Sequence, residues 1–238
     1  MVHAFWKSDD HVAALDDYSG YKTGFTYMKK GLKQADVASI FKNYDDPTIH
    51  GAFHGLYNYL ANSVYLTRIA DQTYNESLQA ALSRLVYPTK RTFSSEKPRE
   101  TNLIYGEAVI NKALNELGMQ WMNILGEIPS QQNQAYFVFG LALHTEMDAY
   151  AHRAGVIQGN QWVKLNESTQ YKGMKNDDKS ICPKRWEVAK SVAYKMIDLY
   201  KPGKVSNYLA VNKSFFRKSD KKGTFYLESF DSYSSYTE

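Results

Sequence analysis

Residues 137–152 read Phe137-Val-Phe-Gly-Leu-Ala-Leu-His144-Thr-Glu-Met-Asp148-Ala-Tyr-Ala-His152. The residues before His144 are apolar on every side of a helix, which is typical of a helix buried on all its faces. The segment then places His144, Asp148 and His152 at intervals of four, so a helix would align them on one stripe. We therefore expect a buried central helix that carries two imidazoles and a carboxylate between them.

The rest of the chain also shows helical periodicity, and signals for strands are few. Turn residues and N-cap residue types separate the periodic segments. The pattern predicts a helix that begins after Ser8-Asp9-Asp10, helices at residues 25–43 (with a break near Gly31), 48–71, 75–87, 101–117 and 119–125, one from Pro129-Ser130 to near Gly155, and one at residues 186–200. Residues 156–183 are expected to form a long polar loop.

These patterns predict an all-α fold with two parts. Residues 1–203 are expected to form a single multi-helix domain around the central helix, which is interpreted below as metal-binding. Residues 204–238 are basic at first and then rich in Tyr, Ser and acidic residues, and we expect them to form a less regular C-terminal extension.

Composition narrows the possible classes of protein. The chain has 238 residues, 43% of them hydrophobic and 23% charged, so it can build a sizeable core without disulfides. Cys182 is the only cysteine, which excludes an intrachain disulfide and a thiolate metal cluster. No apolar run approaches the ~20 residues that span a bilayer. The first residues also lack the apolar region of a signal peptide.

The stripe on the central helix has the chemistry of a metal site. A buried carboxylate without a partner costs several kcal/mol or more, and a metal ion can offset that cost. Imidazole and carboxylate groups together suit a divalent ion such as zinc. A buried His-Asp-His hydrogen-bond network is the structural alternative.

Helix geometry limits how the stripe can bind ions. A step of four residues advances about 6 Å along the axis, so His144 and Asp148 can meet on one ion. His144 and His152 lie about 12 Å apart along the axis and cannot share one. If all three are ligands, at least two ions are implied, and Asp148 is the natural bridge between them.

Further ligands are expected elsewhere among the six histidines. His50 and His54 are also four residues apart, and Asp46 lies one turn before them. His11 follows two aspartates near the N-terminus. Together these settings favour a metal site to which His11, Asp46, His50 and His54 contribute.

The segment Phe139-Gly-Leu-Ala-Leu-His144-Thr-Glu-Met-Asp148-Ala-Tyr-Ala-His152 resembles the central motif of zinc-dependent phospholipase C and its relatives, which include fungal single-strand nucleases. Those proteins carry Gly-x-x-Leu-His-x-x-x-Asp on a helix, with a His shortly afterwards. The resemblance implies an all-α fold and a cluster of zinc ions that hydrolyses phosphodiesters. The motif covers only this helix, and a weaker similarity in the order of ligands covers a larger part of the chain.

The resemblance also implies which residues bind zinc. Asp148 matches the bridging Asp of the family. The implied ligands are His11, Asp46, His50 or His54, His144, Asp148 and His152. The family has a further His-x-x-x-Glu downstream, but this chain has no histidine after His152, and the carboxylates that could substitute are Asp177, Asp178 and Glu187. Family members also bind zinc through an N-terminal Trp, whereas Trp6 is near the start but not first. We therefore expect one to three zinc ions.

The expected function is a metal-dependent hydrolase of phosphoester bonds that acts through a metal-activated water, with Asp148 or Asp46 orienting that water. The substrate is expected to be a small molecule or a lipid headgroup. A net charge of +4, from 29 basic and 25 acidic residues, disfavours long nucleic acid. The alternatives are a zinc-dependent ester or amide hydrolase on the same scaffold, or a non-catalytic helical protein with a structural metal site. The resemblance implies a secreted or extracytoplasmic protein.

Overall fold

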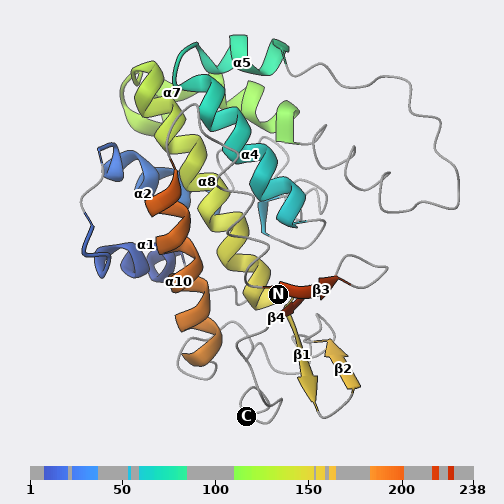
Figure 1. The fold of residues 1–238 in the computed structure, drawn as a ribbon. Coiled ribbons are helices and arrows are strands. Elements are labelled where there is room, and N and C mark those ends of the chain that lie inside the picture. The colour runs from blue at the N-terminus through green and yellow to red at the C-terminus, as the bar shows by residue number, and fades with distance from the viewer. Residues whose placement is uncertain are drawn as a thin grey trace, which may run out of the picture.

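The computed structural model describes residues 8–20, 23–36, 53–54, 59–84, 110–152, 154–158, 161–164, 183–200, 216–219 and 225–227. Helices dominate these residues, which confirms the predicted all-α class (Figure 1). The helices are α1 (Ser8–Asp16), α2 (Phe25–Gln34), α4 (Tyr59–Thr73), α5 (Leu78–Arg84), α7 (Trp121–Leu125), α8 (Gln131–His152) and α10 (Pro183–Leu199). Residues 110–118 are also helical.

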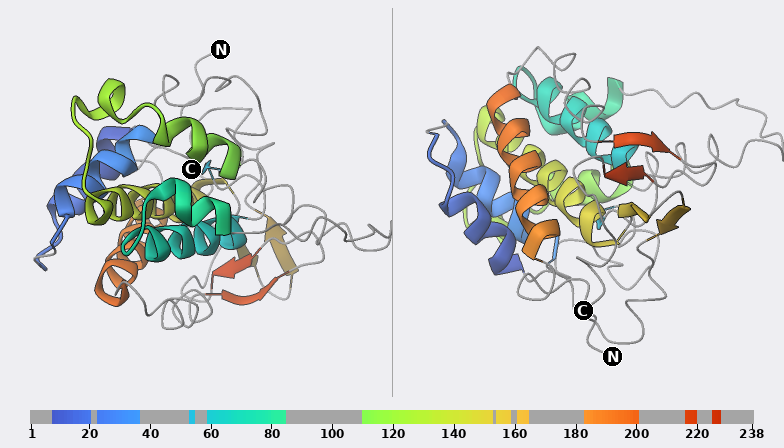
Figure 2. Two further views of the ribbon diagram at one scale, coloured as in Figure 1. Left: turned by 90° about the horizontal axis from the view of Figure 1, so that it is seen from above. Right: turned by 60° about the horizontal axis from the view of Figure 1, so that its bottom comes forward.

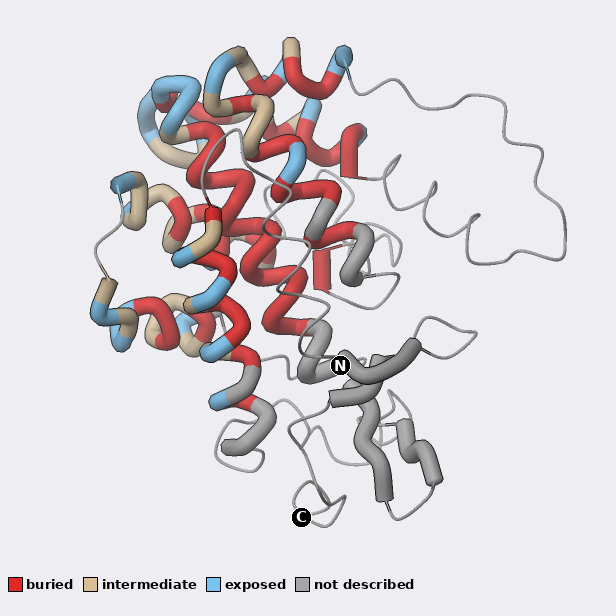
Figure 3. The backbone as a smooth tube through the Cα atoms, in the orientation of Figure 1, coloured by how far each residue is buried: buried red, intermediate tan, exposed pale blue. Residues whose placement is uncertain are grey.

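Helix α8 is the central element, as its apolar sequence predicts. Every residue from 134 to 148 is buried, and Figure 3 shows this burial along the helix. Helix α8 packs against α2, α4 and α10. Helices α2 and α10 lie to one side of it and α4 lies to the other (Figure 1 and Figure 2). The residues on α8 are therefore held from several directions.

The N-terminus of α8 begins where the sequence predicts. Ser130 precedes the helix, and its Oγ accepts a hydrogen bond from the backbone N–H of Asn133 at 3.3 Å, as an N-cap residue does. The Gln134 side-chain amide also donates to the carbonyl of Pro129 at 3.0 Å. The helix ends at His152, a little before the predicted end near Gly155, because the chain enters a strand at Ala154.

Helices α2 and α8 cross at two glycines. A Cβ on Gly31 would overlap the backbone carbonyl of Phe137, and a Cβ on Gly140 would overlap the carbonyl of Met28. The predicted break near Gly31 is wrong, since α2 runs through this residue to Gln34. Gly31 is required for close packing rather than for a kink. The predicted continuation of this helix beyond residue 36 lies outside the described residues.

The segment before α4 also differs from the prediction of one helix over residues 48–71. Phe53 is helical, but His54 lies in a turn, and α4 begins at Tyr59. Gly51 and Gly55 flank this turn in the sequence, and glycine is a poor helix former. The histidine is therefore presented from a turn rather than from a helix face.

Four short strands form a small sheet that the sequence pattern did not predict. They are β1 (Ala154–Gln158), β2 (Gln161–Lys164), β3 (Phe216–Ser219) and β4 (Phe225–Leu227), in the order β2-β1-β4-β3. Strands β1 and β2 form an antiparallel pair, with Val156 opposite Val163. The predicted loop over residues 156–183 is therefore wrong at its start, because β-branched and aromatic residues there favour a hairpin.

The sheet joins distant parts of the sequence. Strand β4 pairs in parallel with β1, with Gly155 opposite Tyr226, and β3 pairs antiparallel with β4. Part of the C-terminal extension thus lies beside the strand that follows α8. Among the described residues, no helix combines the length and the apolar character needed to cross a membrane.

Candidate metal centre

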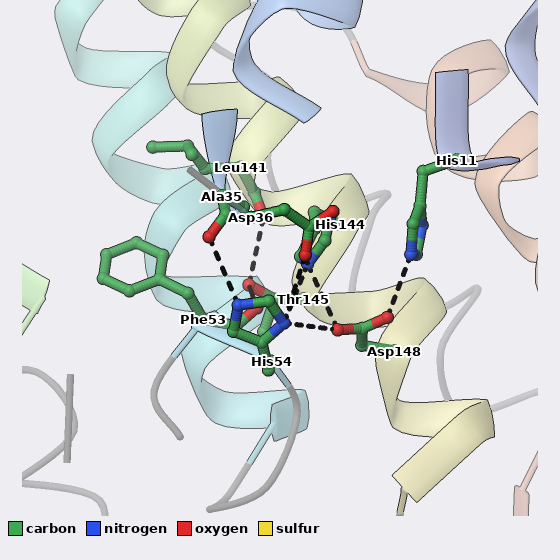
Figure 4. Close-up of polar contacts among 9 residues, drawn as sticks. All are labelled: His11, Ala35, Asp36, Phe53, His54, Leu141, His144, Thr145 and Asp148. Carbon is green, nitrogen blue, oxygen red and sulfur yellow. Dashed lines mark hydrogen bonds and ion pairs between the residues drawn. The ribbon is translucent and has the colours of Figure 1, made fainter. Parts of the chain in front are cut away.

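Five side chains from four parts of the chain converge beside α8 (Figure 4). Helix α8 supplies His144 and Asp148, and α1 supplies His11. Asp36 comes from the turn after α2, and His54 comes from the turn before α4. The side chains of the three histidines and of Asp148 are completely buried, whereas that of Asp36 is 14% exposed.

The carboxylate of Asp148 lies between the imidazoles. Its Oδ1 is 3.1 Å from His11 Nε2. Its Oδ2 is 2.8 Å from His54 Nδ1 and 3.1 Å from His144 Nε2. Figure 4 shows that His11 approaches the carboxylate from the side away from His54. The two oxygens of Asp148 therefore face different imidazoles.

Asp36 approaches the opposite end of the cluster. Its Oδ1 is 3.7 Å from His54 Nδ1 and 3.6 Å from His144 Nε2. The two ring nitrogens of His54 and His144 are themselves 3.1 Å apart. These three residues form a second, compact group of donor atoms.

The tautomer of His54 follows from its outer contact. Its Nε2 is 3.2 Å from the backbone carbonyl of Ala35. A carbonyl only accepts hydrogen bonds, so Nε2 carries the proton, and a neutral ring then has its lone pair on Nδ1. Histidines that bind metal typically donate their other N–H in this way. The turn before α4 thus directs Nδ1 of His54 into the cluster, where it faces Asp148 Oδ2 at 2.8 Å.

A threonine on α8 holds this turn in place. Thr145 Oγ1 lies 2.9 Å from the carbonyl oxygen of Phe53 and 3.0 Å from that of Leu141, so its hydroxyl proton is shared between them. Phe53 directly precedes His54. The contact therefore tethers the turn to the helix that carries His144 and Asp148.

Two overlapping groups of side chains can each hold a metal ion. One group is His11, His144 and Asp148, and the other is Asp36, His54 and His144. Within each group the donor atoms lie within 4.8 Å of one another. Imidazole nitrogens and carboxylate oxygens form a donor set that suits zinc and similar divalent ions. The residues present therefore fit a buried metal centre.

The buried imidazoles and the Asp148 carboxylate change one another's pKa values. Burial disfavours the charged form of His11, but the neighbouring Asp148 carboxylate outweighs this and raises the pKa of the imidazole. Burial likewise opposes ionisation of Asp148, yet the charges of His144 and His11 hold its pKa well below the usual range. The Asp148 carboxylate thus favours the protonated form of His11, and binding of an ion to this imidazole would release that proton.

Glu146 lies between two of these residues in sequence but belongs to neither group. It is completely buried, and burial raises its pKa to about 8, while the hydroxyl of Ser63 on α4 lowers it by less. On a helix, a residue two positions from His144 and Asp148 points to the other side. Burial therefore favours the neutral form of Glu146, which lies on the side of α8 away from the cluster.

The structure brings together four of the residues selected from the sequence, which are His11, His54, His144 and Asp148. Asp46 and His50 lie outside the described residues. His152 is the last residue of α8, but the position of its side chain is outside the described part.

Of the three carboxylates considered as downstream substitutes, the structure describes only Glu187. Asp177 and Asp178 lie outside the described residues. Glu187 is on α10, where it is exposed and pairs with Lys190 at 2.8 Å. It is therefore not among the donor groups found in the described part of the chain.

Asp36 is the member of the cluster that sequence reasoning missed. The predicted helix over residues 25–43 made this residue an ordinary position on a helix, and the resemblance directed attention to Asp46. In the structure α2 ends at Gln34, so Asp36 lies in a turn close to His54. Its acidic side chain just beyond the end of an amphipathic helix was the one available signal.

Comparison with known proteins adds no relative to this description. No family model, curated protein or solved structure matches the chain. The chemistry of the cluster therefore provides the basis for a functional proposal.

Proposed function

We propose that the protein is a metal-dependent hydrolase of phosphoester bonds with a two-ion centre. One ion would be held by Asp36, His54 and His144, and the other by His11, with Asp148 between them. The observation that carries this proposal is the position of Asp148, whose two oxygens face separate imidazoles at 2.8–3.1 Å. A bridging carboxylate of this kind is what a two-ion centre needs.

The assignment of His144 follows from its ring nitrogens. One imidazole nitrogen binds one ion, and His144 Nε2 lies close to both His54 Nδ1 and Asp36 Oδ1. It therefore completes the first group. His11 Nε2 and Asp148 Oδ1 remain for the second.

Divalent ions in such a setting lower the pKa of bound water and neutralise charge on phosphoryl oxygens. The protein contributes a dry and fixed ligand set, because four of the five side chains are fully buried. Asp36 is the partly exposed member, so solvent and substrate would reach the centre from its side. We assign to Asp36 the role of orienting water that the sequence suggested for Asp46.

Zinc and a phosphodiester substrate are supported by the resemblance of the α8 motif to the zinc-dependent phospholipase C group. The absence of any histidine after His152 favours two ions over three. A small phosphodiester or a lipid headgroup fits a protein with a net charge of only +4. An exported protein is the location that this resemblance favours.

The proposal is tested by removing metal with a chelator, restoring zinc and measuring hydrolysis of two substrate panels. One panel contains phosphodiesters, including phospholipid headgroups, and the other contains carboxylic esters and amides. We expect zinc-dependent hydrolysis of a phosphodiester, reduced by roughly 100-fold or more in Asp148→Asn, because the bridge is lost. Asp9→Asn, on the exposed face of α1, is the matched control and should retain activity.

Two results would overturn the proposal. Zinc-dependent activity confined to esters or amides would assign the centre to acyl transfer. Stoichiometric zinc without activity on either panel would indicate a structural metal site.

A further inference from the structure

The indole of Trp186 lies against the ring of His11, and this contact connects α10 to the cluster. The ring centroids are 6.2 Å apart and the planes make an angle of 76°, which is an edge-to-face arrangement. Trp186 is 7% exposed and His11 is fully buried. The imidazole also lies 4.4 Å from the ring of His144, centroid to centroid. Trp186 is thus a ring contact of His11 that lies outside the donor groups.

Binding of the second ion depends on His11 more strongly than binding of the first ion depends on any single residue. In the proposed assignment, Asp36, His54, His144 and Asp148 Oδ2 surround the first ion. Within the described residues, the second ion has His11 Nε2 and Asp148 Oδ1. A site with fewer protein ligands depends more on how firmly each ligand is held before the ion binds.

Helix α10, together with α2, packs against α1 and so helps to position His11. Helix α1 is nine residues long. The contacts of α1 and the turn after it with α10 include an aromatic contact and two hydrogen bonds. These are Trp186 with His11, Tyr194 Oη donating to the Ala14 carbonyl at 2.5 Å, and Tyr18 Oη donating to Asp198. Of these contacts, the one with Trp186 acts on the imidazole itself.

We infer that Trp186 is a positioning residue for His11 and thereby sets the affinity of the second metal ion. The indole N–H is only a hydrogen-bond donor, so Trp186 does not bind the ion. It restricts the His11 ring to the orientation in which Nε2 faces Asp148 Oδ1. This inference rests on the proposed two-ion centre and concerns ion binding rather than the substrate.

The test is a Zn²⁺ titration of chelator-stripped full-length protein, followed by calorimetry and by elemental analysis. We expect wild type to bind two equivalents, the second more weakly. Trp186→Leu should retain the first and weaken the second by about 10-fold or more, the range seen when outer contacts of metal ligands are removed. Trp186→Phe keeps a ring beside His11 and should restore most of the affinity.

Trp121→Leu provides the matched control. Trp121 is 5% exposed and packs edge-to-face on Phe137, so its loss also disturbs the core without touching His11. Equal weakening of both ions in Trp186→Leu and Trp121→Leu would overturn the inference, because it would show a general loss of structure. Uptake of one ion by wild type would overturn it as well.

Two further measurements separate positioning of His11 from a general loss of structure. In a His11→Ala background, Trp186→Leu should have no further effect on zinc binding, since the residue through which Trp186 acts is gone. The second equivalent of Co²⁺ should quench tryptophan fluorescence in wild type and not in Trp186→Phe. Equal quenching in both proteins would contradict the inference. If the protein binds two zinc ions in this way but hydrolyses neither substrate panel, the proposed hydrolase function is refuted and the inference about Trp186 still holds.

Discussion

Gly31 of α2 lies directly against the backbone carbonyl of Phe137 on α8. The contact is between two main chains, so no side-chain movement can relieve an added methyl group. We predict that Gly31→Ala destabilises the protein by about 2 kcal/mol. Overpacking costs up to about 3 kcal/mol, and the better helix propensity of alanine offsets about 1 kcal/mol of it. Urea denaturation measures the difference.

Gly118→Ala is the matched control for this substitution. A Cβ there would meet the end of the Gln79 side chain, which can move away. We expect this variant to be as stable as wild type or slightly more so. Equal stability of Gly31→Ala and wild type would show that the two helices can separate at little cost.

Asp36→Asn should lower zinc binding, because an amide oxygen is a weaker ligand than a carboxylate. We expect the affinity for the first ion to fall by at least about 10-fold, as measured by competition with a chromophoric chelator. Asp16→Asn is the control, because Asp16 is exposed and pairs with Lys29 away from the cluster. Unchanged zinc affinity in Asp36→Asn would exclude this residue as a ligand.

Removal of metal should lower the thermal stability of the protein. An ion that binds only the folded state adds about 4 kcal/mol when its free concentration is about 1,000 times Kd. For a chain of this size, we expect chelation to lower Tm by on the order of 10 °C. Asp148→Asn should respond little to the chelator. A wild-type Tm that is insensitive to chelator and to added zinc would count against a metal centre.

Tyr18 and Asp198 should make stability depend on pH in the alkaline range. Burial and the hydrogen bond to the Asp198 carboxylate raise the pKa of the Tyr18 phenol from 10.0 to about 12. The folded state thus holds this proton more tightly than the unfolded state. The resulting stability is fully present below pH 10 and is lost as the pH rises from 10 to about 12.

The measurement is the free energy of unfolding of wild type and Tyr18→Phe from pH 8 to 11.5. The gap between the two proteins should be constant up to about pH 9 and should shrink above pH 10. Other tyrosines and lysines titrate in both proteins, so the gap isolates Tyr18. A gap that does not change with pH would show that the phenol titrates alike in the folded and unfolded states.

The helical class and the central position of α8 were predictable, because local patterns carry them. An apolar run of this length can only be buried, and Ser130 supplies the N-cap that starts the helix. The hairpin of β1 and β2 was missed, although Gly159-Asn160 between two apolar pairs is a recognised hairpin signal. Its short strands gave a weaker pattern than the helices around them.

The spacing of four residues was enough to place His144 and Asp148 on one face of a buried helix, because that spacing is a property of the helix. Which distant groups meet them depends on the fold. His11, Asp36 and His54 arrive from α1 and from two turns, and their proximity depends on how the helices pack. Contacts between side chains far apart in the chain produce no periodic pattern in the sequence. For this reason the sequence did not predict Asp36 as a member of the cluster.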